Sequence, residues 1–402
     1  MARFEPFCGI RYDPARVDLG AVTAPPYDVL SESDRDQLAG RDPHNIVRID
    51  VPLERHGPGR YDTAAATLHR WLDEGVLVTD VEPSFYLERM SFVDESGTAR
   101  STVGVLGALE VVDPGKGEVL PHERTTPKAR TDRLDLTRAT EANLSAIWGL
   151  SLASGLSSVL AEPGEPLGEL VDDAGVRHTF ERLADPTRMA AVEMAVGAAP
   201  VVIADGHHRY EVARTYRDER RALTGGQPGP WDLTLAYIVE LAEEQLVVQA
   251  IHRLLAGLPA GFDLEGALLP WFEVAGPEPV TPLITRRLLD NGALGLVGPD
   301  GLGRLLRPRP GVFDSEAELD SARLDRALRD VPVTVTFQHG VDNVVAAVTE
   351  RRADYGVLLR PVTVDQIEAT ANDNELMPPK STFFAPKPKT GLVLRSVRGA
   401  SE

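Results

Sequence analysis

A buried strand, a tight turn and a helix are predicted in direct succession by the stretch Pro200-Val201-Val202-Ile203-Ala204-Asp205-Gly206-His207-His208-Arg209. Its apolar half is typical of a strand inside a sheet, and Gly206 lets the backbone turn sharply and approach a ligand closely. The helix is expected to continue over residues 210–223. Because a helix start presents free backbone N–H groups and the positive end of the helix dipole, we expect this turn to bind an anion.

The polar residues of this turn are the first candidate site. His207, His208 and Arg209 supply side-chain donors for a phosphate, and Asp205 either caps the helix or holds a magnesium ion. The structural alternative is a capped turn whose histidines face solvent. Four polar side chains and a glycine directly after a buried strand are unusual for structure alone, so we favour a phosphate-binding loop of Asp205, Gly206, His207, His208 and Arg209.

The elements on either side of this stretch predict a mixed α/β fold. Helices are expected over 63–74, 184–194 and 316–328, and strands over 85–93, 102–112, 200–204, 233–240, 246–251 and 331–337. The proline-rich tail over 374–389 is expected to form no regular element, because proline lacks a backbone N–H group.

At 402 residues the chain is long enough for two or three domains. We expect an α+β region over 1–113, a core over 114–253 that carries the motifs, and a second α+β region over 254–402.

Composition and charge exclude several classes of protein. The net charge of −19 disfavours nucleic-acid binding, which depends on Lys and Arg at phosphates. A secretory signal and an apolar run of about 20 residues are both missing, so we expect a cytoplasmic protein that makes no contact with a membrane. The lone Cys8 excludes an intrachain disulfide and a cysteine-based zinc site.

The lysines are few and clustered. Of 42 basic residues only five are lysines, and all of them fall within 116–128 and 380–389. An ammonium is a compact point charge that the planar guanidinium of arginine cannot replace at every site. Chance clustering is the alternative, but both windows are candidates for function.

The first window contains His122-Glu123-Arg124, in which a glutamate stands between cationic side chains. Glu123 is the candidate general base for a substrate hydroxyl, with His122 and Arg124 as substrate-binding residues. The alternative is a charged surface segment.

The second window contains Lys380-Ser381-Thr382, whose ammonium and hydroxyl groups can bind an oxyanion of the substrate. It lacks the upstream glycines of a Walker A loop. The alternative is a proline-rich segment that packs its aromatic residues on the core.

Two weaker pairs complete the candidates. Tyr27-Asp28 follows two prolines, and a structural role and a functional role are equally compatible with it. For His252-Arg253, at the end of a strand, a structural role is favoured. Adjacent histidines such as His207 and His208 are poorly placed to bind one metal together, and we expect no metal site in the chain.

Together these segments resemble the DUF1015 family over residues 4–393; they are Pro25-Pro26-Tyr27-Asp28, His122-Glu123-Arg124-Thr125, Ala204 to Glu211 and Met377 to Lys387. More distantly, the His-Glu and Asp-Gly-His-His-Arg motifs resemble the ParB/sulfiredoxin-like fold and its free serine kinases. This resemblance implies a ParB-like core with N- and C-terminal α+β extensions. It also implies that Glu123 is the base and that the Asp205–Arg209 loop holds nucleotide phosphates. The separation of 82 positions from Glu123 to Asp205 is longer than we expect for the compact kinases, so an insertion is expected there.

The expected function is a small-molecule kinase that transfers phosphate from a nucleotide or pyrophosphate to a hydroxyl, with free serine as the first acceptor. Mg²⁺ with ATP or ADP is the expected cofactor. The sequence does not determine the oligomeric state, and a homodimer is one possibility. A nucleotide-binding regulator without turnover and a phosphoester hydrolase are the alternatives. Phosphoryl transfer needs mainly positioning and charge stabilisation, so one pocket lined by Glu123, His207, Arg209 and Lys380 would be sufficient.

Overall fold

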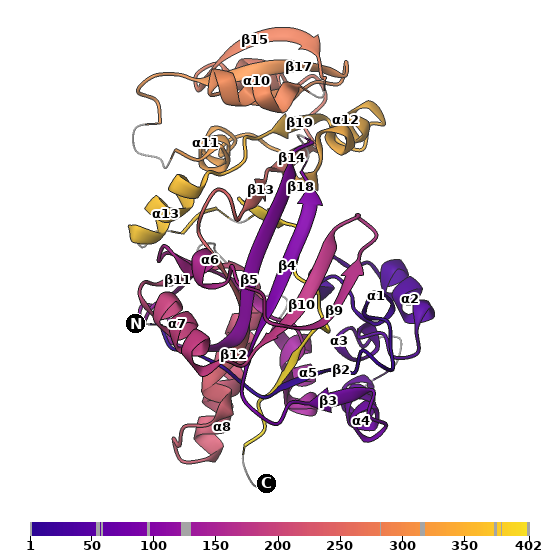
Figure 1. Ribbon diagram of the computed structural model, residues 1–402. Helices are drawn as coiled ribbons and strands as arrows, with labels where there is room; N and C mark the ends of the chain where they lie inside the picture. Colours follow the sequence, from indigo (N-terminus) through magenta and orange to yellow (C-terminus); the bar gives the residue numbers. More distant parts are fainter. Residues whose placement is uncertain are drawn as a thin grey trace. The chain divides into compact units, whose positions relative to one another are not determined.

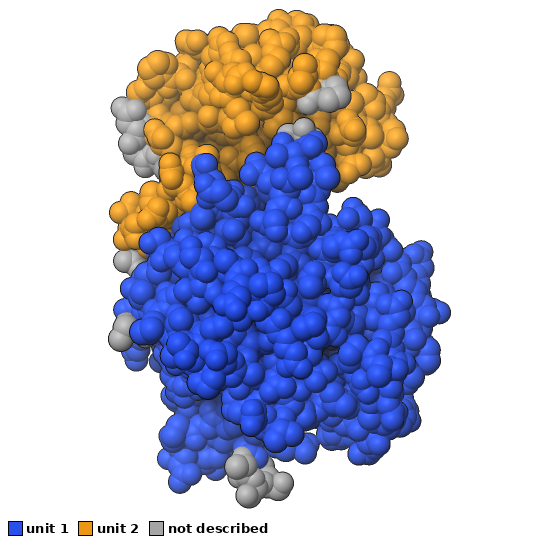
Figure 2. Space-filling model, in the orientation of Figure 1, with its two compact units in different colours: residues 1–247, 386–402 blue, residues 248–385 orange. Residues whose placement is uncertain are grey.

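The computed structural model describes residues 2–53, 57, 59–94, 97–121, 130–281, 283–313, 318–373, 376–378 and 380–399. The chain forms two compact units, shown in different colours in Figure 2. Unit 1 comprises residues 1–247 and 386–402, and unit 2 comprises residues 248–385. The division expected from the sequence, 1–113, 114–253 and 254–402, differs because strands from both of its first two regions pair in one sheet.

A nine-stranded sheet forms the centre of unit 1, in the order β6-β11-β8-β12-β5-β4-β10-β9, with β1 also paired to β5 (Figure 1). Its strands are β1 (Phe4–Glu5), β4 (Phe85–Val93), β5 (Ala99–Glu110), β6 (Val119–Pro121), β8 (Ile147–Ser151), β9 (Glu165–Val171), β10 (Arg177–Leu183), β11 (Val201–Asp205) and β12 (Leu233–Glu240). The pairs β6–β11 and β8–β12 are parallel, and the other pairs along the path are antiparallel.

The two faces of this sheet follow from the alternation of side chains along each strand. Phe85 and Leu87 of β4 lie in an apolar core with residues of α6 (Leu156–Val159) and α7 (Pro186–Gly197). Tyr86 and Glu88 lie on the opposite face, where the Tyr86 hydroxyl accepts a hydrogen bond from the backbone N–H of Gly9 at 2.9 Å.

Gly9 belongs to a second sheet of unit 1, in the order β3-β2-β21-β7. Its strands are β2 (Gly9–Tyr12), β3 (Leu77–Thr79), β7 (Ala142–Asn143) and β21 (Leu394–Ser396). The last strand of the chain thus pairs with the second. The remaining helices of unit 1 are α1 (Leu19–Val22), the 3-10 helix η1 (Tyr27–Val29), α2 (Glu32–Arg41), α3 (Val47–Asp50), α4 (Arg60–Asp73), α5 (Arg130–Thr140), α8 (His207–Leu223) and the 3-10 helix η4 (Pro230–Asp232).

Unit 2 is built on an antiparallel sheet in the order β15-β17-β16-β19-β14-β18. The strands are β14 (Ile251–Ala256), β15 (Phe272–Pro279), β16 (Leu294–Val297), β17 (Leu302–Pro308), β18 (Thr334–His339) and β19 (Tyr355–Leu358). The helices are α9 (Leu264–Leu268), α10 (Ile284–Asn291), α11 (Asp320–Ala327), α12 (Val341–Thr349) and α13 (Val364–Asn372). A separate pair joins β13 (Val247–Gln249) to β20 (Phe383–Ala385).

The predicted mixed α/β class is confirmed, and the bounds expected for β4 and β12 agree with the structure. Two expectations were wrong in detail. The strand expected over 246–251 is split between β13 and β14, and the tail expected to be irregular contains β20, whose three residues precede Pro386. Across the described ranges, no helix combines the length and the apolar character that crossing a membrane requires.

Candidate functional site

The predicted loop lies where β11 ends and α8 begins. The pairing of β11 with β8 shifts register between Ile203 and Asp205, because Ala204 is an extra residue in β11 and Asp205 pairs with Trp148. Gly206 then adopts φ 85° and ψ 27°, a left-handed conformation that favours glycine. A side chain at this position would start 3.2 Å from the backbone Cα of Ile147 and 3.0 Å from Nε of Arg209. Both the turn and the close approach therefore require glycine here.

The Asp205 carboxylate has two sets of partners. Oδ1 accepts a hydrogen bond from the backbone N–H of Gly206 at 2.9 Å, and Oδ2 pairs with Nζ of Lys387 at 2.5 Å. The Arg209 guanidinium lies 3.6 Å from Oδ2. Burial alone would raise the pKa of Asp205, but Lys387 and Arg209 outweigh it and hold that pKa well below its usual range.

Asp205 therefore does not cap the helix, contrary to one of its two expected roles. The cap residue of α8 is Gly206, since the Asp205 carboxylate is turned back to the Gly206 N–H group and to Lys387. Glycine has no side chain to accept a hydrogen bond, and the first turn of α8 contains no acidic residue. The positive end of this 17-residue helix is thus not neutralised from within its own first turn.

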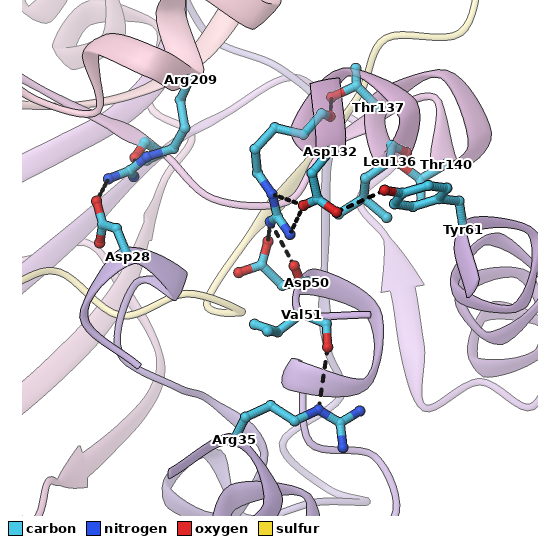
Figure 3. A network of polar contacts seen from close by, with 12 residues as sticks. Asp28, Arg35, Asp50, Val51, Tyr61, Asp132, Leu136, Thr137, Thr140 and Arg209 are labelled. Atoms are coloured by element: carbon cyan, nitrogen blue, oxygen red, sulfur yellow. Dashed lines mark hydrogen bonds and ion pairs between the residues drawn. The ribbon is translucent and has the colours of Figure 1, made fainter. Parts of the chain in front are cut away.

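Arg209 connects the start of α8 to two other segments of unit 1, one at Ala146 and one at Asp28. One guanidinium nitrogen donates to the Ala146 carbonyl, and the other pairs with Oδ2 of Asp28 at 3.3 Å (Figure 3). Burial would lower the pKa of Arg209, but Asp28 and Asp205 reverse the effect and raise it. The side chain is only 9% exposed, so these contacts hold the start of α8 in place.

Tyr27 and Asp28, which the sequence left open between structure and function, thus belong to this site. The Tyr27 ring lies beneath two guanidinium groups, with its centroid 4.2 Å from Cζ of Arg133 and 5.7 Å from Cζ of Arg209. Such stacking favours cations at both positions. Burial raises the pKa of the Tyr27 hydroxyl, against the lowering effect of Arg209 and Arg133.

A second polar network continues from Arg133 (Figure 3). Its guanidinium donates to the Asp50 carbonyl at 2.6 Å and pairs with Oδ2 of Asp132 at 3.1 Å, while Asp132 accepts from the Tyr61 hydroxyl at 2.7 Å. Burial raises the pKa of Asp50, and Arg133 opposes this shift. The network connects α3, α4 and α5 through these side chains.

A small cavity lies between this network and α8. Its volume is about 50 Å³, and its polar lining includes Asp50, Arg133 and Arg209. A water molecule needs roughly 10–15 Å³ of such space, so the cavity can hold a few waters beside the guanidinium groups. Arg209 consequently has room on one side although its other contacts are closely packed.

His207 and His208 are the first two residues of α8, and both are half-buried. Their backbone N–H groups belong to the first turn of α8 and point toward its N-terminal end. The predicted phosphate-binding role of these two residues stays a prediction.

The other predicted site residues are not placed together with the loop. His122, Glu123 and Arg124 lie outside the described residues, so the general base stays a prediction. Lys380, Ser381 and Thr382 belong to unit 2, whereas the loop belongs to unit 1. The expected convergence of Glu123, His207, Arg209 and Lys380 also stays a prediction.

Within unit 2, the Lys380 turn is held by its neighbours. Lys380 is exposed and has φ 59°, an unusual conformation for a residue with a side chain. Arg253 donates to its carbonyl at 3.1 Å, and the buried Ser381 hydroxyl binds the Pro378 carbonyl at 2.7 Å and the Ser321 hydroxyl at 3.0 Å. The turn therefore presents the Lys380 side chain outward, whereas the Ser381 hydroxyl has a structural partner on each side.

The pair His252-Arg253 has the structural role favoured from the sequence. Nδ1 of His252 accepts a hydrogen bond from the Leu359 backbone N–H at 3.2 Å, and burial lowers the His252 pKa to about 4. Arg253 is buried and also donates to the Ile251 carbonyl at 2.6 Å.

Lys387 belongs to this site, although it was not among the predicted site residues. The signal was available, because the second lysine window contains Lys380, Lys387 and Lys389. The adjacent Ser and Thr favoured Lys380 within that window. In the structure, it is Lys387 that pairs with Asp205.

A dedicated metal site is not formed by the part of the chain that the structure describes, where no three His, Cys, Asp or Glu side chains are grouped suitably. Both Asp205 oxygens already have donors, so the magnesium role considered for Asp205 does not fit this arrangement. Mg²⁺ commonly binds through one or two carboxylates together with substrate phosphates.

Comparisons with known proteins give one family and several distant structures. A family model described as "Protein of unknown function (DUF1015)" matches residues 4–326. No sequence among the curated proteins matches this chain.

Three solved structures are similar at low identity. A conserved hypothetical protein from Pyrococcus furiosus is 13% identical, with a TM-score of 0.36 over 68% of this chain and 92% of that one. A free serine kinase in complex with AMP is 12% identical, with a TM-score of 0.38 over 68% and 88%. SbnI with a C-terminal truncation, from Staphylococcus aureus, is 12% identical, with a TM-score of 0.38 over 71% and 85%.

Proposed function

The chain belongs to the DUF1015 family, and we propose that it binds the phosphate groups of a nucleotide at the start of α8. The observation that carries this proposal is the meeting of Arg209 and Lys387 at Asp205, directly beside the N-terminus of a long helix. Backbone N–H groups, two cations and a glycine turn are the groups with which proteins bind phosphate.

The overall charge makes such a concentration of positive groups significant. A protein with a net charge of −19 repels anions at long range, so an anionic ligand needs local compensation. Arg209 and Lys387 provide it, and they are kept in place by Asp28 and Asp205. The carboxylates thus hold the two cations in position before a ligand binds.

The reaction that we propose at this site is phosphate transfer to a hydroxyl group. Glu123 accepts the proton of the acceptor hydroxyl, the oxygen attacks the terminal phosphorus, and the nucleotide leaves with one phosphate fewer. Free serine is the first acceptor to test, because the motifs resemble those of free serine kinases. A magnesium ion carried by the nucleotide would supply further charge neutralisation on the phosphates.

The binding step is tested by calorimetric titration of the purified protein with ATP, ADP and AMP. We expect His208→Asn to weaken binding at least tenfold, and the matched control His69→Asn, at an exposed position of α4, to leave it unchanged. Wild-type protein that binds none of the three nucleotides would refute the proposal.

The transfer step is tested separately by phosphorus NMR with magnesium, serine and each donor in turn, including pyrophosphate. A phosphoserine signal that disappears in Glu123→Gln would support the kinase function. Nucleotide binding without any phosphorylated product would exclude serine kinase activity and favour the regulator that binds without turnover.

A further inference from the structure

A short segment after unit 2 carries two lysines to two different acidic sites of unit 1. We call this segment, Pro386 to Thr390, the tail strap. Nζ of Lys387 pairs with Asp205, whereas Nζ of Lys389 pairs with Oδ2 of Asp172 at 2.7 Å. The strap ends at Thr390, which forms a β-bridge with Ala24.

Lys389 is fixed in a buried cluster of charged groups. Its backbone N–H donates to Oε1 of Glu88 at 3.1 Å, and its side chain is 8% exposed. His178 lies between the two carboxylates, with Nδ1 2.8 Å from Glu88 Oε1 and Nε2 3.3 Å from Asp172 Oδ2. Each ring nitrogen of His178 thus contacts one carboxylate, and Lys389 contacts both carboxylates, through its backbone N–H at Glu88 and its ammonium at Asp172.

Buried charge clusters of this kind are costly to form and costly to disrupt. Glu88 and His178 are both essentially without solvent exposure, on the neighbouring strands β4 and β10, which are the third and second strands from the β9 edge of the sheet. The cluster therefore anchors Lys389 on a rigid element. Pro386 and Pro388 restrict the backbone on either side of Lys387, so the anchor at Lys389 also limits where Lys387 can reach.

We propose that Lys387 is a phosphate-binding residue of the loop and that Lys389 is the residue that positions it. The proposal rests on the proposed nucleotide binding at α8. On binding, the Lys387 ammonium donates to a phosphate oxygen in place of Asp205 Oδ2. A lysine suits this exchange because its three donors rotate on a flexible stem.

The partners of Asp205 make the exchange feasible. When Lys387 moves to the phosphate, Oδ1 keeps the Gly206 N–H group and Oδ2 keeps the Arg209 guanidinium nearby. The partly buried carboxylate therefore keeps a hydrogen-bond donor and a cation. Before binding, the same ion pair keeps the Lys387 ammonium beside the first turn of α8.

The test measures nucleotide affinity by calorimetry for four proteins: wild type, Lys387→Met, Lys389→Met and the double variant. We expect each single variant to bind at least tenfold more weakly, and the double variant to bind no more weakly than Lys387→Met alone. Such non-additivity arises when one residue acts only through the other. Lys116→Met, which removes an exposed lysine paired with Asp113, is the control and should bind like wild type.

Asp205→Asn is a second test, in which nucleotide affinity is expected to rise and not to fall. This test does not require the Met variants to fold. The amide no longer competes with the phosphate for the Lys387 ammonium, while the Lys389–Asp172 pair still holds the strap in place, so the nucleotide should bind about threefold or more tightly. Loss of affinity in Asp205→Asn would contradict the exchange.

Hydrogen exchange of the free protein gives a readout without ligand. Lys389→Met should speed exchange in residues 386–390 and 206–210, and Lys389→Arg should restore most of the protection.

The outcomes separate this proposal from the one on which it rests. Wild type that binds no nucleotide refutes the proposed function and this inference together. Wild type that binds, with Lys387→Met binding equally well, refutes only the role of Lys387. Additive losses in the double variant refute the positioning role of Lys389.

Discussion

Replacing Gly206 with alanine tests the structure of the loop most directly. The residue has φ 85°, and a left-handed conformation costs an alanine about 1–2 kcal/mol relative to its preferred conformations. The new methyl group would also stand 3.2 Å from the Ile147 Cα and 3.0 Å from Nε of Arg209. The backbone atom cannot yield easily, so Arg209 must shift and weaken its ion pairs.

Gly225→Ala is the matched control, because Gly225 has φ 68° and no neighbouring atom within 4 Å of the added methyl group. The conformational cost and the gain from a less flexible unfolded chain are similar for both variants and cancel in the comparison. We expect a loss of about 1 kcal/mol for Gly225→Ala and about 2–3 kcal/mol for Gly206→Ala.

Urea denaturation followed by tryptophan fluorescence is a suitable assay, since Trp148 lies opposite Asp205 in the β8–β11 pair and reports on this part of the sheet. Equal losses for the two glycine variants would show that the close contacts at Gly206 carry no energy, and would refute the reasoning about the loop.

Three further predictions concern acid stability and the turn of unit 2. The Asp205 pKa is lower in the folded chain than its unfolded value near 4, so its contribution to stability is present above about pH 4 and is lost as the pH falls further. In Asp205→Asn, the free energy of unfolding measured by urea denaturation should therefore decrease less steeply below pH 4 than in wild type. An unchanged pH dependence would exclude the Asp205–Lys387 pair as its source. The His252 pKa is lowered to about 4, so unit 2 should lose up to about 3 kcal/mol as the pH falls from about 6.5 to 4. His252→Asn, which retains an acceptor for the Leu359 N–H, should remove most of that dependence; a slope like that of wild type would contradict it. Ser381→Ala should cost about 1–2 kcal/mol by thermal denaturation, because its hydroxyl binds Pro378 and Ser321, and a smaller change would show these bonds to be weak.

Local patterns predicted the elements around the loop well. An apolar run followed by Asp-Gly was sufficient to place β11, the turn and α8, because each depends on neighbouring residues only. The boundaries of β4 and β12 followed from residues of high β propensity between turn residues. The role of Gly206 was likewise readable from its position at the turn.

Long-range pairings were not readable from local patterns. Asp28 and Arg209 are 181 residues apart, and Asp205 and Lys387 are 182 residues apart. Ion pairs at such distances depend on the order of strands in the sheet, which side-chain periodicity does not determine. The small number of lysines did point to the correct window, but residue type alone could not separate Lys387 from Lys380.

Buried charges were the least predictable feature. Glu88 lies between Leu87 and Arg89 in β4, and nothing in its local sequence distinguishes it from a solvent-facing glutamate. It is fully buried because His178 and the Lys389 backbone provide donors from distant segments. Partners of this kind become visible only when the sheet is assembled.

The division of unit 1 into two pieces has a consequence for protein synthesis. The tail strap and β21 leave the ribosome only after all of residues 248–385, which takes on the order of 10 s at typical elongation rates. Unit 2 is continuous in sequence and can complete its fold during that interval. Unit 1 must wait with the edge of β2 unpaired and Asp205 without Lys387. The candidate site is therefore completed only after residues 386–390 have been synthesised, and a nascent chain that stalls before them carries the Asp-Gly-His-His-Arg loop without its lysine.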